Sequence, residues 1–192
     1  AEGPLASVSL NDLWLRHRHE WCPVPALAKL PRFPLLVKLL DCGEASSVQV
    51  HPNNEQAAQL APGETGKTEA WYVLEAAPES RLYTGLLPGV TETELRSHLA
   101  AGTVVDILHA VTPQAGDAFL IDAAVPHAIS AGLVLFEIEQ CSDLTLRLFD
   151  WQRVDKDGHP RQLHVEAALR CLDWQHPVVN RSIPRDLRCD VD

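Results

Sequence analysis

The chain has 192 residues, of which 46% are hydrophobic and 22% are charged, as in ordinary globular proteins. This composition excludes disorder over the whole chain, and the longest uncharged apolar run is far too short to cross a bilayer. The formal net charge is −10, and Lys and Arg are not clustered, whereas nucleic-acid binding requires a basic surface. We therefore expect neither nucleic acid nor a membrane as a partner.

Five cysteines occur, at positions 22, 42, 141, 171 and 189, and none of them belongs to a C-x-x-C pair. An odd number of scattered cysteines indicates free thiols rather than a disulfide framework. Free thiols are typical of a reducing compartment, so we expect a cytoplasmic protein. Residues 1–4 show neither the basic start nor the apolar stretch of a signal peptide, which agrees with this expectation.

The first predicted element is a helix that begins after Ser9, where Leu10, Leu13 and Trp14 share one face. Short segments separated by Pro and Gly then predict strands. In chain order these predicted strands cover residues 35–41, 46–51, 69–75, 81–85, 117–122, 133–140 and 144–151. Many short strands at even spacing indicate a sandwich, a jelly roll or a barrel.

Further helices are expected between and after these strands. Thr91 and Glu94 form a capping-box pattern, and Gly102 is expected to end that helix. A shorter helix is expected over residues 103–109, and an apolar stripe at helical spacing predicts another over residues 165–172. The chain therefore combines many strands with a few attached helices, without the alternation of strand and helix that marks a parallel sheet.

The most informative local pattern is Val48-Gln49-Val50-His51-Pro52. Side chains two residues apart on a strand point to the same face, so Gln49 and His51 are expected to project together. An amide beside an imidazole could form half of a metal site. A polar strand end near a turn would give the same pattern, so the residues alone leave both interpretations open.

A second pattern lies at the start of the predicted strand that begins at Glu69. Lys67 precedes Glu69 by two residues, so their side chains could share a pocket; a solvated ion pair at a strand edge is the alternative. Gly66-Lys67-Thr68 also looks like the end of a phosphate-binding P-loop. That interpretation fails, because Ala61 stands where the motif requires its first glycine.

Two later segments carry further polar residues. Gly116-Asp117 opens a strand that leads to His127, and a lone histidine in apolar surroundings is usually a core residue. On the predicted strand 144–151 and the residue before it, Asp143 and Arg147 lie on one face while leucines fill the other. An arginine at such a position must pair with a carboxylate or face an anionic ligand.

Taken in order, Gln-x-His, Gly-x-x-Glu, Gly-Asp followed by His, and Asp-x-x-x-Arg resemble the pattern of a cupin, a small jelly roll that holds a metal. More closely, the chain is similar to class I mannose-6-phosphate isomerase, or phosphomannose isomerase, in its short bacterial form. This resemblance implies a mainly β cupin jelly-roll barrel with a few attached α-helices. It runs from about residue 5 to 175, over the matching stretches 33–41, 47–53, 66–73, 116–117, 127–129, 142–151 and 161–165.

The resemblance also implies that a metal ion is bound by four residues, Gln49, His51, Glu69 and His127. Zinc accepts imidazole and carboxylate ligands, and a catalytic zinc site leaves one position open. The amide oxygen of Gln49 is a less usual ligand, so another divalent metal would also fit.

Three further residues, Lys67, Arg147 and Asp143, match the family's active-site cations and an acid near them, and we expect them to be catalytic. The implied reaction interconverts mannose 6-phosphate and fructose 6-phosphate by moving a proton between C1 and C2 through an enediol. The sequence leaves the base open among Lys67, Glu69 and Asp143. The expected partner is a sugar phosphate. The alternatives are a non-catalytic metal-binding cupin that binds a sugar, and an isomerase of a different sugar.

Two features depart from the family pattern. The family usually has Pro-Ala-Gly before its histidine segment, where this chain has Asp122-Ala123-Ala124, so the turn that presents His127 is expected to differ. The family also has more chain on both sides. We therefore expect residues 1–175 to form the metal-binding catalytic domain with helical insertions. Residues 176–192 are expected to form a tail or the start of a truncated second cupin-like domain.

Overall fold

The computed structural model describes residues 3, 5–175 and 178–182. The chain separates into two compact units, residues 1–36 and 37–192, and each is described by itself. Over the described residues, no helix has both the length and the apolar character that crossing a membrane requires. The expected domain boundary near residue 175 adjoins residues 176 and 177, which lie outside the described part, so it stays a prediction.

The first unit contains α1 (Leu10–Trp21) and a 3₁₀ helix, η1 (Leu27–Lys29). Helix α1 begins as predicted, because the backbone N–H of Asp12 donates a hydrogen bond to the side chain of Ser9. Trp14 is buried; its Nε1 donates to the carbonyl oxygen of Leu30 at 3.1 Å, and its ring meets Phe33 edge to face. This indole anchors the helix to the segment that follows it.

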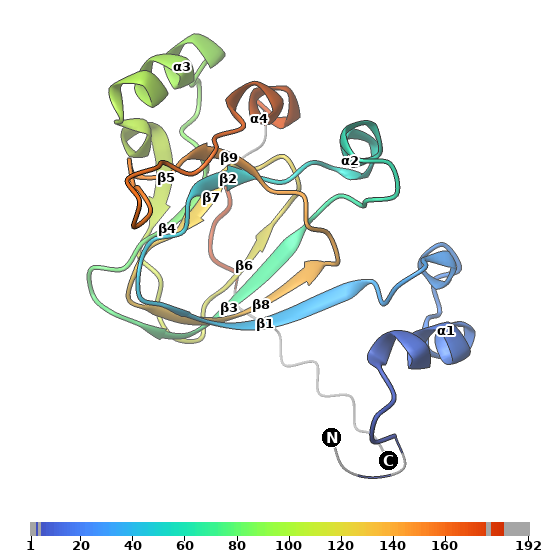
Figure 1. Ribbon diagram of the computed structural model, residues 1–192. Coiled ribbons are helices and arrows are strands. Elements are labelled where there is room, and N and C mark those ends of the chain that lie inside the picture. The colour runs from blue at the N-terminus through green and yellow to red at the C-terminus, as the bar shows by residue number, and fades with distance from the viewer. Residues whose placement is uncertain (1–2, 4, 176–177, 183–192) are drawn as a thin grey trace. The chain divides into compact units, whose positions relative to one another are not determined.

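The second unit is built on two antiparallel sheets, a four-stranded sheet in the order β1-β8-β3-β6 and a five-stranded sheet in the order β5-β4-β7-β2-β9 (Figure 1). This mainly β architecture confirms the predicted fold class. The strands are β1 (Leu35–Cys42), β2 (Val48–Val50), β3 (Glu69–Ala76), β4 (Leu82–Leu86), β5 (Leu108–Val111), β6 (Ala118–Ile121), β7 (His127–Ile129), β8 (Leu133–Gln140) and β9 (Leu146–Phe149).

Helices α2 (Asn54–Leu60), α3 (Glu92–Ala101) and α4 (Val165–Cys171) and the 3₁₀ helix η2 (Val104–Ile107) complete this unit. Helix α3 has the predicted capping box of Thr91 and Glu94, and it ends at Gly102, whose φ of 74° suits glycine. Helix α2 was not predicted. It also begins with a capping box, formed by Asn53 and Gln56.

Two expectations about local structure were wrong. The helix expected over residues 103–109 is only the single turn η2, because residues 108–111 form strand β5 and pair with β4. His109 therefore lies on a strand, with its Nδ1 3.0 Å from the hydroxyl of Thr84. The last strand is also shorter than predicted: β9 begins at Leu146, so Asp143 precedes it and does not share a strand face with Arg147.

Apolar side chains form two clusters, which show which face of the five-stranded sheet is turned toward the helices and which toward the other sheet. Val48, Val50 and Ala128 pack in the cluster that includes residues of α3, η2 and α4. Strand side chains alternate between faces, so Gln49 and His127 point the opposite way, toward the other sheet. The second cluster, which joins Trp71 and Phe119 of one sheet to residues of the other, fills the rest of that inter-sheet space. Polar residues on the inward faces are thus enclosed between the sheets.

Candidate metal centre

A row of polar residues crosses the five-stranded sheet on its inward face. Gln49 of β2 lies opposite His127 of β7 on one side and opposite Arg147 of β9 on the other. Leu146 and Leu148 belong to the helix-side cluster, which leaves Arg147 on the inward face with Gln49. The pairing of three strands therefore brings together residues that are almost a hundred positions apart in the sequence.

The two predicted histidines are both 1% exposed, and their ring centroids lie 4.9 Å apart. The Nδ1 of His51 is 2.8 Å from the carbonyl oxygen of Leu144, and that of His127 is 2.9 Å from the carbonyl oxygen of Val125. A carbonyl oxygen only accepts, so each Nδ1 must carry the proton. Each Nε2 therefore carries a lone pair in place of a proton, as a metal ligand requires.

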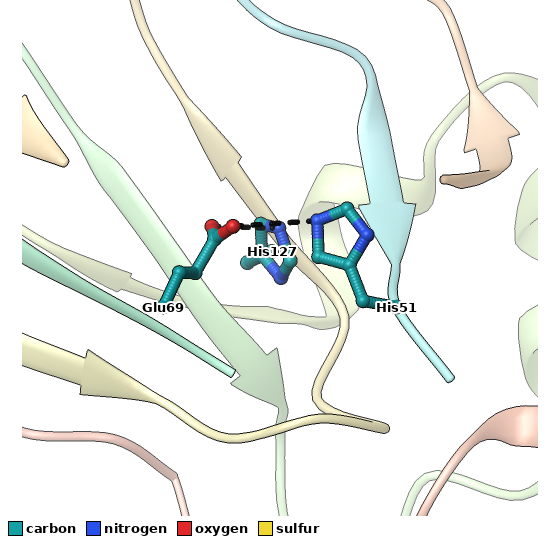
Figure 2. Close-up of side chains that lie close together, drawn as sticks. All are labelled: His51, Glu69 and His127. Carbon is teal, nitrogen blue, oxygen red and sulfur yellow. Dashed lines mark ion pairs between the residues drawn. The ribbon is translucent and has the colours of Figure 1, made fainter. Parts of the chain in front are cut away.

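Glu69, at the start of β3, completes this cluster from the other sheet (Figure 2). Its Oε1 lies 3.2 Å from His127 Nε2, and its Oε2 lies 3.4 Å from His51 Nε2. Candidate ligand atoms of the three residues all fall within 4.8 Å of one another. The Nε2 of His51 and both carboxylate oxygens of Glu69 are buried without a hydrogen-bond partner. Such atoms normally have a partner, so this donor set fits a bound cation.

Gln49 lies at the edge of the same cluster and is half-buried. Its Nε2 is 3.4 Å from His127 Nε2, and its Oε1 accepts a hydrogen bond of 3.3 Å from the hydroxyl of Ser47. Turning the amide by 180° exchanges its oxygen and nitrogen and would direct the oxygen toward the cluster. The structure thus brings all four predicted ligands together, with Gln49 adaptable as an oxygen donor.

The electrostatics of the cluster favour the protonation states that bind a metal. Burial lowers the pKa of His127 to about 4, which keeps the imidazole neutral at physiological pH. Burial by itself would raise the pKa of Glu69, but His127, His51 and Lys67 together outweigh it and lower that pKa below its usual value. The neutral imidazole of His127 beside the ionised carboxylate of Glu69 suits a divalent ion.

Lys67 is buried beside this cluster, as its position before Glu69 suggested, with Nζ 3.6 Å from Glu69 Oε2. Its nearer partner was not predicted: Glu139 of β8, whose Oε2 lies 2.6 Å from Nζ. Glu137 of the same strand and Lys38 of β1 extend the network, with Lys38 Nζ 2.8 Å from Glu137 and 2.6 Å from Glu139. The alternation along β8 could have indicated that Glu137 and Glu139 point inward, because they lie at the same parity as the inward-facing Leu133 and Leu135.

A cavity of about 600 Å³ adjoins the metal cluster at Gln49. Polar and charged side chains dominate its lining, among them Ser47, Gln49, Arg147, Arg153 and Arg161. Asp150 also lines the cavity and makes ion pairs with Arg153 and Arg161. Burial alone would raise the pKa of its carboxyl, but the two arginines outweigh burial and lower that pKa.

Arg147 differs from the two paired arginines. Its guanidinium donates to the carbonyl oxygen of Gln162 at 2.8 Å, and its buried Nε has no hydrogen-bond partner. It makes no ion pair with any carboxylate among the described residues. Its charge is therefore available to an anion in the cavity. Asp143, by contrast, is exposed, and within the described chain it makes no hydrogen bond or ion pair with the other predicted site residues.

A mainly β fold of two facing sheets defines a cupin, and the buried histidines and carboxylate between the sheets could hold a metal ion. Comparisons with known proteins show which family the chain resembles. Residues 1–79 match the sequence model of "Phosphomannose isomerase type I, catalytic domain". The mannose-6-phosphate isomerase ManA of Bacillus subtilis is 35% identical over 171 residues, which are 89% of this chain and 53% of that protein. A mannose-6-phosphate isomerase of Streptococcus mutans is 37% identical over 91% of this chain and 54% of its own length.

Solved structures agree with these sequence matches. The crystal structure of the B. subtilis mannose 6-phosphate isomerase superposes with a TM-score of 0.82 at 33% identity, over 93% of this chain and 55% of that one. A putative mannosephosphate isomerase of Archaeoglobus fulgidus gives a TM-score of 0.65 at 26% identity, over 84% and 49% of the two chains. Over most of its own length, the chain is similar to type I phosphomannose isomerases. It spans about half the length of the curated relatives that it matches.

Proposed function

We propose that this chain carries the catalytic centre of a mannose-6-phosphate isomerase, which interconverts mannose 6-phosphate and fructose 6-phosphate. The observation that supports this most directly is the adjacency of two features. A buried cluster with metal-ligand chemistry shares Gln49 with a cavity that an unpaired arginine lines. A sugar phosphate needs both, one for its reacting oxygens and one for its phosphate.

Gln49, His51, Glu69 and His127 are the proposed ligands, and Zn²⁺ is the proposed ion, because imidazole and carboxylate are its usual donors. An amide oxygen in the set would also admit another divalent metal. A bound divalent ion would supply Lewis-acid stabilisation of the negative charge that develops on the sugar oxygens. The protein's own contribution is to hold the donor atoms in place, through the hydrogen bonds of both Nδ1 atoms to backbone carbonyl oxygens.

Lys67 is the residue that we propose stabilises charge and assists proton transfer at C1 and C2 of the sugar. It is buried, and its Nζ lies 3.6 Å from a carboxylate oxygen of the proposed ligand Glu69. Held there as an ammonium ion, it would donate a hydrogen bond to the sugar oxygen that gains charge in the enediolate. Asp143 is exposed in this structure, and its expected catalytic role stays a prediction.

Arg147 is the proposed contact for the phosphate. It lies next to Gln49 across the β2–β9 pair and lines the cavity of about 600 Å³ together with Ser47 and Arg153. A guanidinium presents a planar fork of donors that matches phosphate oxygens.

A coupled assay of the zinc-loaded chain tests the proposal with three compounds: mannose 6-phosphate, free mannose and glucose 6-phosphate. We expect turnover of mannose 6-phosphate to far exceed that of the other two. Equal turnover of free mannose would indicate an isomerase that does not use the phosphate. Tight binding of mannose 6-phosphate by a metal-loaded chain without any turnover would instead indicate a non-catalytic sugar-binding cupin.

A further inference from the structure

Glu139 is a buried carboxylate that the proposed reaction does not yet use. It lies directly opposite Glu69 in the pairing of β3 with β8, and it is 2% exposed. Each of its oxygens meets a different ammonium group: Oε2 lies 2.6 Å from Lys67, and Oε1 lies 2.6 Å from Lys38. A buried carboxylate that makes ion pairs with two cations is held in a fixed position.

Lys67 thus lies between the carboxylates of Glu139 and Glu69, and it is closer to Glu139. Its Nζ is 2.6 Å from Glu139 Oε2 but 3.6 Å from Glu69 Oε2, which is also the oxygen nearest His51 Nε2. An ammonium ion that moved closer to Glu69 would compete with a metal for that oxygen. In a buried site such competition is strong, because the charges are poorly screened.

We propose that Glu139 is a positioning residue that holds the Lys67 ammonium off Glu69 and so leaves the Glu69 carboxylate free for the metal. This inference rests on the proposed metal centre. It adds a role for a residue that is not a proposed ligand and does not line the substrate cavity.

A second metal site is the alternative use for these acids, since Glu69, Glu137 and Glu139 offer ligand atoms within 4.8 Å of one another. The two lysines argue against it. Lys38 contacts both Glu137 and Glu139, and Lys67 contacts both Glu139 and Glu69, so ammonium groups already supply the positive charge there. Trp71 also donates its Nε1–H to Glu137 at 3.2 Å.

The test measures Zn²⁺ affinity by competition with a chromogenic chelator, without any substrate. Glu139→Gln keeps the shape of the side chain and removes its charge, so Lys67 is expected to turn to Glu69 and affinity to fall about tenfold. In a Lys67→Met background the same change is expected to have no effect, because the competing ammonium is gone. A purely structural role of Glu139 would weaken binding in both backgrounds and would overturn the proposal.

Glu137→Gln is the matched control, because it removes a neighbouring buried carboxylate that contacts Lys38 but makes no ion pair with Lys67 among the described residues. Its Zn²⁺ affinity should stay within about threefold of the parent chain, whereas an equal loss in both variants would overturn the proposal. A chain that binds Zn²⁺ but does not turn over mannose 6-phosphate contradicts the proposed function, while Glu139 is still judged on affinity. A parent chain that binds no Zn²⁺ overturns both.

Discussion

The Oε1 atom of Glu69 lies 3.2 Å from Nε2 of His127, although the two residues belong to different sheets. Glu69 begins β3 of the four-stranded sheet, and His127 begins β7 of the five-stranded sheet. The cluster therefore exists only when the inward faces of the sheets meet. Replacing any residue that contributes a ligand atom should therefore weaken metal binding more than it weakens the packing of the strands.

Replacing His51 or His127 by Ala should abolish metal binding, because each removes an Nε2 atom from the cluster. Elemental analysis of protein purified without chelator should show about one equivalent of metal in the parent chain and almost none in either variant. His17→Ala is the control, since that ring is 41% exposed and contacts Glu20 and Trp21 instead. Equal metal loss in all three variants would show that the histidines act through folding.

The stability of the metal-free chain should fall as the pH drops from about 6.5 to about 4. Burial lowers the pKa of His127 from 6.5 to about 4, so between these values the unfolded chain binds more protons than the folded one. Stability then decreases with falling pH, by about 3 kcal/mol at most. The lowered pKa of Glu69 acts only below its ordinary value of 4.5, so its contribution is lost at still lower pH.

Denaturant unfolding of the metal-free chain at several pH values measures this dependence. His127→Asn serves as the comparison, because it keeps a polar side chain but cannot titrate. Its free energy of unfolding should change less than that of the parent chain between pH 6.5 and pH 4. Parallel curves for the two proteins would assign the pH dependence to other groups.

Arg147→Lys should lower kcat/KM for mannose 6-phosphate by about 100-fold, or roughly 2.7 kcal/mol of transition-state stabilisation. The physical reason is geometric, since Lys offers a single point charge in place of a planar fork of donors. Steady-state kinetics would measure the loss. Arg81→Lys is the control, because the Arg81 guanidinium donates to nearby backbone oxygens within the described chain and does not line the cavity. Unchanged kinetics in a folded Arg147→Lys protein would give Arg147 a structural role.

Gly66→Ala should destabilise the fold and disturb the neighbouring Lys67. A Cβ atom at position 66 would lie 2.5 Å from the backbone carbon of Asn53, a contact that backbone atoms cannot relieve by rotation. We expect a loss of about 1–3 kcal/mol in the free energy of unfolding, measured with urea. Gly43→Ala is the control, since none of the described residues beyond its chain neighbours lies within 4 Å of the atom it would add. Equal stability of both variants would contradict the close approach.

Much of the fold could be predicted from the spacing of apolar residues and from the residues that cap helices or form turns. Alternating strands such as 133–140 and the capping box at Thr91 have local causes, and the structure confirms both. Strand β7 was missed because it is only three residues long and all three are buried, so it shows no alternation. Helix α2 was missed although Asn53 and Gln56 carry its capping signal.

Part of the candidate site could be predicted from the sequence because side chains two residues apart on a strand share a face. Gln49 and His51 share a strand face by parity, and Lys67 and Glu69 do so at the next strand, so each half followed from local geometry. Their meeting with His127 depends on how the sheets pack, which no local pattern reports. Glu139 escaped notice because an acidic residue on a strand is usually solvated, and only the paired lysines make its burial acceptable.

The long separation of the site residues along the chain has a kinetic consequence. Gln49 and His127 are 78 positions apart, and Lys38 and Glu137 are 99 positions apart. Loops of that length must close before the ligands meet, so we expect the complete site to form late in folding. A metal ion that binds only the finished site would leave the folding rate nearly unchanged and would slow unfolding instead. The ion would therefore lengthen the lifetime of the native chain.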